Sequence, residues 1–186
     1  MNQFELLRAR QSEISYCGEA VMNAVELLLA RDMTLLAIGT HEQGICHRLA
    51  LYFEPWFSTY SVDCEYNRME SKVKRVLVDD KKQIVKPDIL VHERLCSENC
   101  LAVEAKATSN PESGYEPHKL IGLLNDADFH YNVGLFLIVE NAKRQILEHE
   151  YVQIRGRWLG IDQLKDFKLR RMVDKCTLGW VQKRER

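Results

Sequence analysis

The segment KPDILVHERLCSENCLAVEAKAT, residues 86–108, holds two short apolar runs that charged residues interrupt. The runs at 87–92 and 101–107 flank a polar loop and favour β-structure, so they predict an antiparallel pair of strands. Asp88 stands at the head of the first run, and Glu104 lies inside the second. A charge inside a strand is costly to bury unless it has a partner. The segment therefore predicts a strand pair, and its charged side chains are expected to have a partner.

Upstream of this segment the sequence predicts two helices. Residues 4–31 are rich in helix formers, with apolar residues at helical spacing, and Gly18 is expected to bend or break this helix. An apolar link follows at 33–40. Thr40 and Gln43 match a capping box, which predicts that the second helix begins at Thr40.

The remaining chain alternates between patterns of strand and helix, which indicates an α/β fold around a mixed sheet. The apolar run at 132–140 is typical of a strand that is buried on both faces. We further expect strands at 60–66, 74–79 and 150–161, a turn at 80–83, and helices at 116–127 and 162–176.

Composition limits the class of protein. The chain has 186 residues, 46% hydrophobic and 28% charged, which fits one globular domain over 1–186. Six cysteines after a polar, charged N-terminus predict free thiols in the cytoplasm, and no apolar run is long enough to span a bilayer. The net charge of −1 does not by itself indicate a nucleic-acid binder, and the basic clusters at 72–75 and 168–171 are interpreted as solvated surface.

Three charges form a candidate site. Because strand side chains alternate between faces, Glu104 and Lys106 share a face, and Asp88 shares one with Leu90, so pairing would bring Asp88 toward Glu104. Two adjacent carboxylates repel each other, and a hard divalent cation such as Mg²⁺ or Mn²⁺ relieves that conflict. Lys106 could then orient or help deprotonate a water, or stabilise charge on a phosphate. A plain structural ion pair between Glu104 and Lys106 is the alternative.

The PD of 87–88, followed after a spacer by EAK at 104–106, resembles the PD-(D/E)xK phosphodiesterase superfamily. HRLALYFEPWF and VDCEYNR further upstream also resemble small prokaryotic proteins of that superfamily. The resemblance covers about 40–140. It implies a restriction-endonuclease-like mixed sheet flanked by helices, with a catalytic core over 40–140 and an N-terminal helical extension over 1–38.

Carried over residue by residue, the resemblance implies a magnesium site in which manganese can substitute. Asp88 and Glu104 would be metal ligands together with the backbone carbonyl of Ala105. Lys106 would be the catalytic lysine, and Glu42 would bind the metal directly or through water.

Other residues could complete the site. Strand alternation puts Asp63 and Glu65 on one face, so Glu65 could extend the acidic cluster and Arg68 could clamp a phosphate, although a surface Arg–Glu pair fits equally well. Lys119, on the helix after the second strand, is expected to point toward a DNA phosphate. Tyr115 lies in a polar loop that could meet a substrate.

These observations predict a Mg²⁺-dependent deoxyribonuclease whose partner is DNA. Two alternatives stay open: a catalytically inactive module that binds nucleic acid or protein, and a plain α/β scaffold. The sequence is also compatible with a homodimer, or with a protein partner that supplies DNA affinity.

Overall fold

The protein is an α/β protein in which N-terminal helices precede a six-stranded mixed sheet. The computed structural model describes residues 3–69, 72–78, 81–94, 99–108, 118–126, 128–129, 131–142, 150–159 and 164–173. The helices are α1 (Gln3–Arg31), α2 (Met33–Ala37), α3 (Glu42–Phe53) and α4 (His118–Asn125). The strands are β1 (Ser61–Cys64), β2 (Arg68–Met69), β3 (Lys72–Val73), β4 (Arg75–Val78), β5 (Lys81–Ile84), β6 (Ile89–His92), β7 (Asn99–Thr108), β8 (Tyr131–Ala142), β9 (Glu150–Leu159) and β10 (Phe167–Val173).

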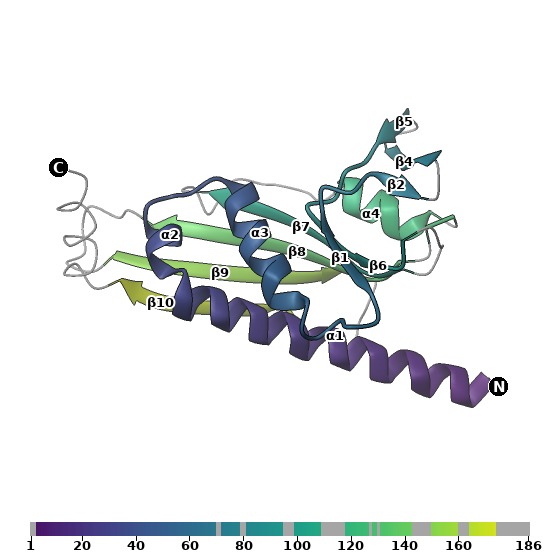
Figure 1. The fold of residues 1–186 in the computed structure, drawn as a ribbon, viewed down its shortest axis with the longest axis horizontal. Helices are drawn as coiled ribbons and strands as arrows, with labels where there is room; N and C mark the ends of the chain where they lie inside the picture. Colours follow the sequence, from purple (N-terminus) through teal and green to yellow (C-terminus); the bar gives the residue numbers. More distant parts are fainter. Residues whose placement is uncertain are drawn as a thin grey trace.

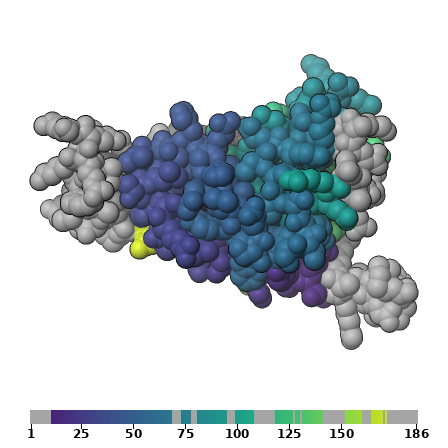
Figure 2. All heavy atoms as spheres, viewed as in Figure 1, coloured from purple at the N-terminus to yellow at the C-terminus, as the bar shows by residue number. Residues whose placement is uncertain are grey.

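The sheet has the strand order β1-β6-β7-β8-β9-β10. Only β7 and β8 run parallel, and the other neighbours are antiparallel. Helices α1, α2 and α3 cover one face, and α4 lies over the other, which gives three layers (Figure 1). The space-filling view shows the residues of α1 to α3 spread across one face of the molecule (Figure 2). The two short pairs, β2–β3 and β4–β5, stand apart from this sheet.

Helix α1 runs through Gly18 without a break, so the predicted break at this residue is wrong. Cys17, Val21, Ala24 and Leu28 are fully buried at helical spacing against the sheet. A Cβ at position 18 would lie 2.9 Å from a methyl carbon of a leucine in the segment before β10, so the glycine permits close packing at this point.

Strands β6 and β7 form the antiparallel pair that the sequence predicts, with Ile89 opposite Val103. Leu101, Val103 and Ala105 face the helices α1 to α3, as the alternation requires. Ala102 packs on the opposite side, with α4. Strand β8 is confirmed as a strand buried on both faces.

Helix α4 lies very close to β8 because of a glycine. A Cβ at Gly134 would be 2.5 Å from the Cδ1 atom of Leu124, a distance that real Cβ atoms essentially never show. Leu120 and Leu123 of α4 are buried in the same apolar cluster as Ala102 and Phe136. The helix thus lies over the stretch of β7 that contains Glu104.

The predicted link at 33–40 contains the short helix α2, which is followed by Gly39. Gly39 has a φ of 73°, a left-handed conformation that ends helices and favours glycine. The predicted capping box is wrong, because α3 begins at Glu42 after His41. His41 is extended and its side chain makes no capping hydrogen bond.

Two further predictions are wrong for the same reason, which is strand pairing. Residues 81–83 belong to β5, which pairs with β4, and do not form the expected turn. Residues 167–173 form β10, not a helix, because they pair along their whole length with β9. Phe167 and Leu169 alternate toward the core, so tertiary pairing overrides the helical spacing.

Candidate functional site

The candidate site lies where β7 extends beyond its neighbour. Strand β6 begins at Ile89, opposite Val103, whereas β7 continues to Thr108. Two carboxylates take the place of the missing strand on this edge. The backbone N–H of Ala105 donates to Oδ2 of Asp88 at 2.7 Å, and the N–H of Ala107 donates to Oε2 of Glu42 at 2.9 Å. Both carboxylates therefore have a defined structural role.

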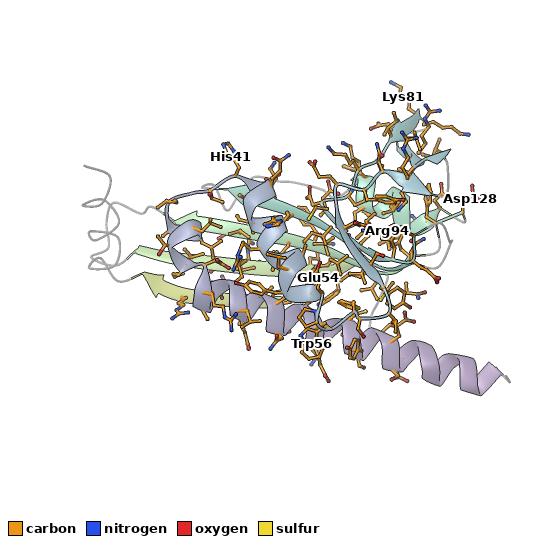
Figure 3. All side chains as sticks on the ribbon, viewed as in Figure 1. His41, Glu54, Trp56, Lys81, Arg94 and Asp128 are labelled. Atoms are coloured by element: carbon orange, nitrogen blue, oxygen red, sulfur yellow. The ribbon has the colours of Figure 1, made fainter. Side chains whose placement is uncertain are left out.

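Lys106 projects from the same stretch of β7 and pairs with α3. Its Nζ lies 3.0 Å from Oε2 of Glu42 and 3.4 Å from Oε1. Glu42 is the first residue of α3, next to His41, which Figure 3 shows at the exposed start of that helix. About a third of each side chain is exposed, so the pair borders solvent. The ion pair that the structure describes for Lys106 is with Glu42, and the alternative pair between Lys106 and Glu104 stays a prediction.

Asp88 and Glu104 are electrostatically coupled. Burial raises the pKa of Glu104 to about 7, with the nearby charge of Asp88 acting in the same direction and Lys119 opposing the rise. Burial also raises the pKa of Asp88, and Glu42 acts in the same direction, while the Ala105 amide opposes it. Asp88, Glu104, Lys106 and Glu42 thus come together in space although they are distant in sequence.

The carbonyl of Ala105 belongs to the same edge. In a strand, the N–H and C=O of one residue point to the same side. Because the Ala105 N–H reaches Asp88, its carbonyl oxygen also faces the edge that β6 leaves open.

The donor set fits a magnesium ion held by few protein ligands. Among the described residues, no group of three or more His, Cys, Asp and Glu side chains is gathered closely enough to hold a metal. Mg²⁺ commonly uses one or two carboxylates and keeps several waters. Asp88, Glu104 and the Ala105 carbonyl match that pattern. Glu42 is engaged with Lys106 and Ala107, so it fits a contact through water better than a direct one.

Two cysteines border Asp88, and no pattern in the sequence indicates them. Burial raises the pKa of the Cys46 thiol, and Asp88 raises it further. Cys64, at the end of β1, has a raised pKa for similar reasons, and its Sγ lies 3.9 Å from the backbone oxygen of Cys46. Both thiols are therefore neutral at ordinary pH.

Glu65 does not share a face with Asp63, so that prediction is wrong. Strand β1 ends at Cys64, and Glu65 has a φ of 52°, which breaks the alternation. Its N–H donates to the backbone oxygen of Asp88 at 3.1 Å, and its side chain binds Lys86 at 2.9 Å. Glu65 therefore holds the backbone of Asp88 in place.

Asp63 belongs to another cluster. His92 Nε2 lies 3.0 Å from Oδ2 of Asp63, and Arg94 Nε donates to the same oxygen at 2.8 Å. These contacts, with Arg94 as the main cause, hold the pKa of Asp63 below its usual range. His92 is almost completely buried.

The two predicted phosphate-binding residues differ in position. Lys119, exposed on α4, is close enough to influence Glu104. Arg68 is exposed on β2, and the described residues provide no contact between it and the acidic cluster. Tyr115 lies outside the described residues.

No protein-family model, curated protein or solved structure matches the chain. The superfamily resemblance therefore rests on the chain's own residues. Within the described part of the chain, no helix combines the length and apolar character needed to cross a bilayer.

Proposed function

We propose that the protein is a Mg²⁺-dependent nuclease of the PD-(D/E)xK type that hydrolyses DNA phosphodiester bonds. One observation carries the proposal. Two half-buried carboxylates with raised pKa values, Asp88 and Glu104, lie at an open strand edge within electrostatic range of Lys106. Carboxylates whose pKa values are raised by burial and by each other are typical of functional sites, because a bound cation or a proton relieves the conflict.

Asp88, Glu104 and the Ala105 carbonyl would hold the ion. When bound, Mg²⁺ would act as a Lewis acid on a phosphate oxygen and neutralise charge that builds on the phosphoryl group. Lys106 would orient the attacking water and stabilise negative charge on the phosphate. Glu42 would fix the position of the Lys106 ammonium through their ion pair.

Lys119 would contact a neighbouring backbone phosphate from α4. Its influence on Glu104 puts it within reach of a substrate that is bound to the same edge. The near-neutral chain, with its net charge of −1, makes such local cations important for DNA affinity.

A second candidate is a non-catalytic binding module that kept this arrangement for stability. It is favoured by the hydrogen bonds that Asp88 and Glu42 accept from the free amides of β7. Under this alternative the carboxylates complete the strand edge and bind no metal.

Purified protein incubated with supercoiled plasmid or single-stranded DNA, in Mg²⁺ or Mn²⁺, tests the proposal. Lys106→Met and Asp88→Asn should abolish cleavage with folding retained, since the amide oxygen of an asparagine can still accept the Ala105 hydrogen bond. Lys165→Met, an exposed lysine before β10, is the matched control and should cleave like the wild type. Equal cleavage by all variants would contradict the assigned site.

Metal binding separates the two candidates. Thermal unfolding with Mn²⁺ should raise the Tm of the wild type but not that of Asp88→Asn, because ligand binding stabilises only the state that binds it. The absence of both cleavage and a Mn²⁺-dependent shift in the wild type would favour the non-catalytic module.

A further inference from the structure

The β4–β5 hairpin stands off the sheet on the side of α4 (Figure 1). Arg75 pairs with Ile84 across the hairpin, and Leu77 pairs with Lys82. All four side chains are exposed, with Leu77 at 58% and Ile84 at 53%. These four residues form what we call the outer face of the hairpin. It combines two cations with two aliphatic side chains that are turned to solvent.

The inner side of the hairpin is firmly held. Val76 is buried against α4, and a Cβ at Gly122 would lie 3.1 Å from the backbone oxygen of Leu77. Lys74, just before β4, is only 1% exposed, and its Nζ donates to the hydroxyl of Tyr131 at 2.6 Å. The interpretation of the 72–75 cluster as solvated surface is therefore wrong for Lys74. The hairpin is anchored, and its outer face has a fixed direction.

The hairpin is a local basic surface on a nearly neutral chain. Residues 72–86 contain six lysines and arginines and two aspartates, and the aspartates occupy positions 79–80, outside the described residues. Lys74 is buried and Lys86 is paired with Glu65, so the exposed cations of the hairpin are Arg75, Lys81 and Lys82. Lys81 projects at the exposed end of the hairpin in Figure 3. Among the described ion pairs, none involves Arg75, Lys81 or Lys82.

The hairpin leads directly into the candidate site. Strand β5 ends at Ile84, and Asp88 follows four residues later. An extended chain advances at most about 3.5 Å per residue, so the two Cα atoms are at most about 14 Å apart. The packing of α4 against β4 and its Lys119 connect the two regions from the other side.

We propose that the outer face of the β4–β5 hairpin binds duplex DNA in the major groove beside the candidate site. This inference rests on the proposed nuclease function. A two-stranded ribbon fits the major groove, which is about 12 Å wide. Arg75 and Lys82 of the outer face contact phosphates at the groove walls, and Lys81, which pairs with Val78 on the other face, reaches a phosphate from the exposed end of the hairpin. Leu77 and Ile84 contact base edges, where the thymine methyl group offers an apolar surface.

Phosphate contacts and base-edge contacts differ in how the affinity for DNA depends on salt concentration. Each phosphate contact contributes about 0.9 to the slope of log K against log salt concentration. Replacing Arg75, Lys81 and Lys82 with glutamine should therefore reduce the slope by roughly 2.7, and weaken binding most at low salt. Replacing Leu77 and Ile84 with serine should weaken binding at every salt concentration and leave the slope unchanged, because no charge is removed.

Fluorescence anisotropy of a labelled duplex of about 20 base pairs, titrated in EDTA from about 50 to about 300 mM KCl, measures both effects without cleavage. The matched control removes three exposed charges that lie outside the hairpin, at the end of α1, just before β10 and on β10, as Arg31→Gln, Lys165→Gln and Lys168→Gln combined. This control should bind with the wild-type slope. Unfolding in urea verifies that every variant keeps the wild-type stability.

Three results would overturn the inference: no binding by the wild type, equal slopes for the hairpin and control variants, or unchanged affinity after the serine replacements. Light scattering tests whether the outer face is instead an interface between two copies of the chain. If the serine replacements shift a dimer to a monomer and leave DNA affinity unchanged, the outer face is an interface between copies of the chain. Cleavage in Mg²⁺ is measured separately. A hairpin variant should need more DNA to reach half-maximal cleavage, whereas failure of the proposed function would appear as no cleavage by the wild type, with DNA binding in EDTA intact.

Discussion

Glu104→Gln should remove a pH-dependent penalty on the metal-free protein. The pKa of Glu104 rises from 4.5 to about 7 in the folded state, mainly through burial. Because one pKa unit corresponds to about 1.4 kcal/mol, ionised Glu104 destabilises the fold by about 3 kcal/mol above pH 7. Glutamine has a similar shape and carries no charge, so it does not incur this cost.

The sign follows from which state binds the proton more tightly. Below pH 4.5, Glu104 is protonated in both the folded and the unfolded chain, and ionisation makes no difference. Between about pH 4.5 and pH 7 the unfolded chain loses this proton first, so the free energy of unfolding falls as pH rises. The stability of Glu104→Gln minus that of the wild type should therefore increase by about 3 kcal/mol between pH 4 and pH 8.

Urea unfolding in EDTA at several pH values between about 4 and 8.5, analysed by linear extrapolation, measures this difference. Glu54→Gln, an exposed glutamate after α3 that Figure 3 labels, is the control and should run parallel to the wild type. Added Mg²⁺ at about ten times its Kd should stabilise the wild type by about 1.4 kcal/mol at pH 8, and the variant much less. A difference curve that stays flat within about 1 kcal/mol would refute the electrostatic argument.

Two further predictions concern buried charges away from the strand edge. Burial lowers the pKa of Lys74 to about 8, so the wild type should gain stability between pH 8 and pH 10.5, whereas Lys74→Met should not. Urea unfolding at about pH 7.5 and pH 9.5 measures this difference in the free energy of unfolding. Equal gains for the two proteins would contradict the prediction. Asp63→Asn should cost about 1–3 kcal/mol at pH 7, because buried His92 and its neighbour Arg94 lose a charged partner, while exposed Asp128→Asn should change unfolding by less than about 0.5 kcal/mol.

The central strand pair and the approach of Asp88 to Glu104 could be predicted from sequence, because strand alternation is local and strict. Two charges in otherwise apolar runs stand out for the same reason. The alternation also puts Asp88 on the face of Leu90, and Leu90 is buried with Ala102 in the cluster beneath α4.

Two features of the site could not be predicted from the sequence: where each strand ends, and which distant residues its side chains contact. Strand β6 begins one residue after Asp88, and this end leaves the amides of Ala105 and Ala107 for side chains to satisfy. The partner of Lys106 comes from α3, 64 positions away, and no local pattern encodes that contact.

Contacts between residues that are distant in sequence also explain the predictions of helix and of exposure that are wrong. Residues 167–173 have helical spacing, but β9 offers them a full antiparallel partner. Lys74 belongs to a basic cluster that looks solvated, yet its ammonium lies 5.5 Å from the ring centre of Tyr66 and 5.2 Å from that of Tyr131, which stabilises it in the interior. Burial of this kind is decided by tertiary structure, not by neighbours in sequence.

The strands at the two borders of the sheet bear on self-association. Strand β1 has four residues, and β10 carries Lys168 and Arg171, both exposed. Short or charged border strands discourage a strand of another molecule from adding to them. If two copies assemble, we therefore expect them to meet through side chains and not through an intermolecular β-sheet, and concentrated protein should resist fibril formation.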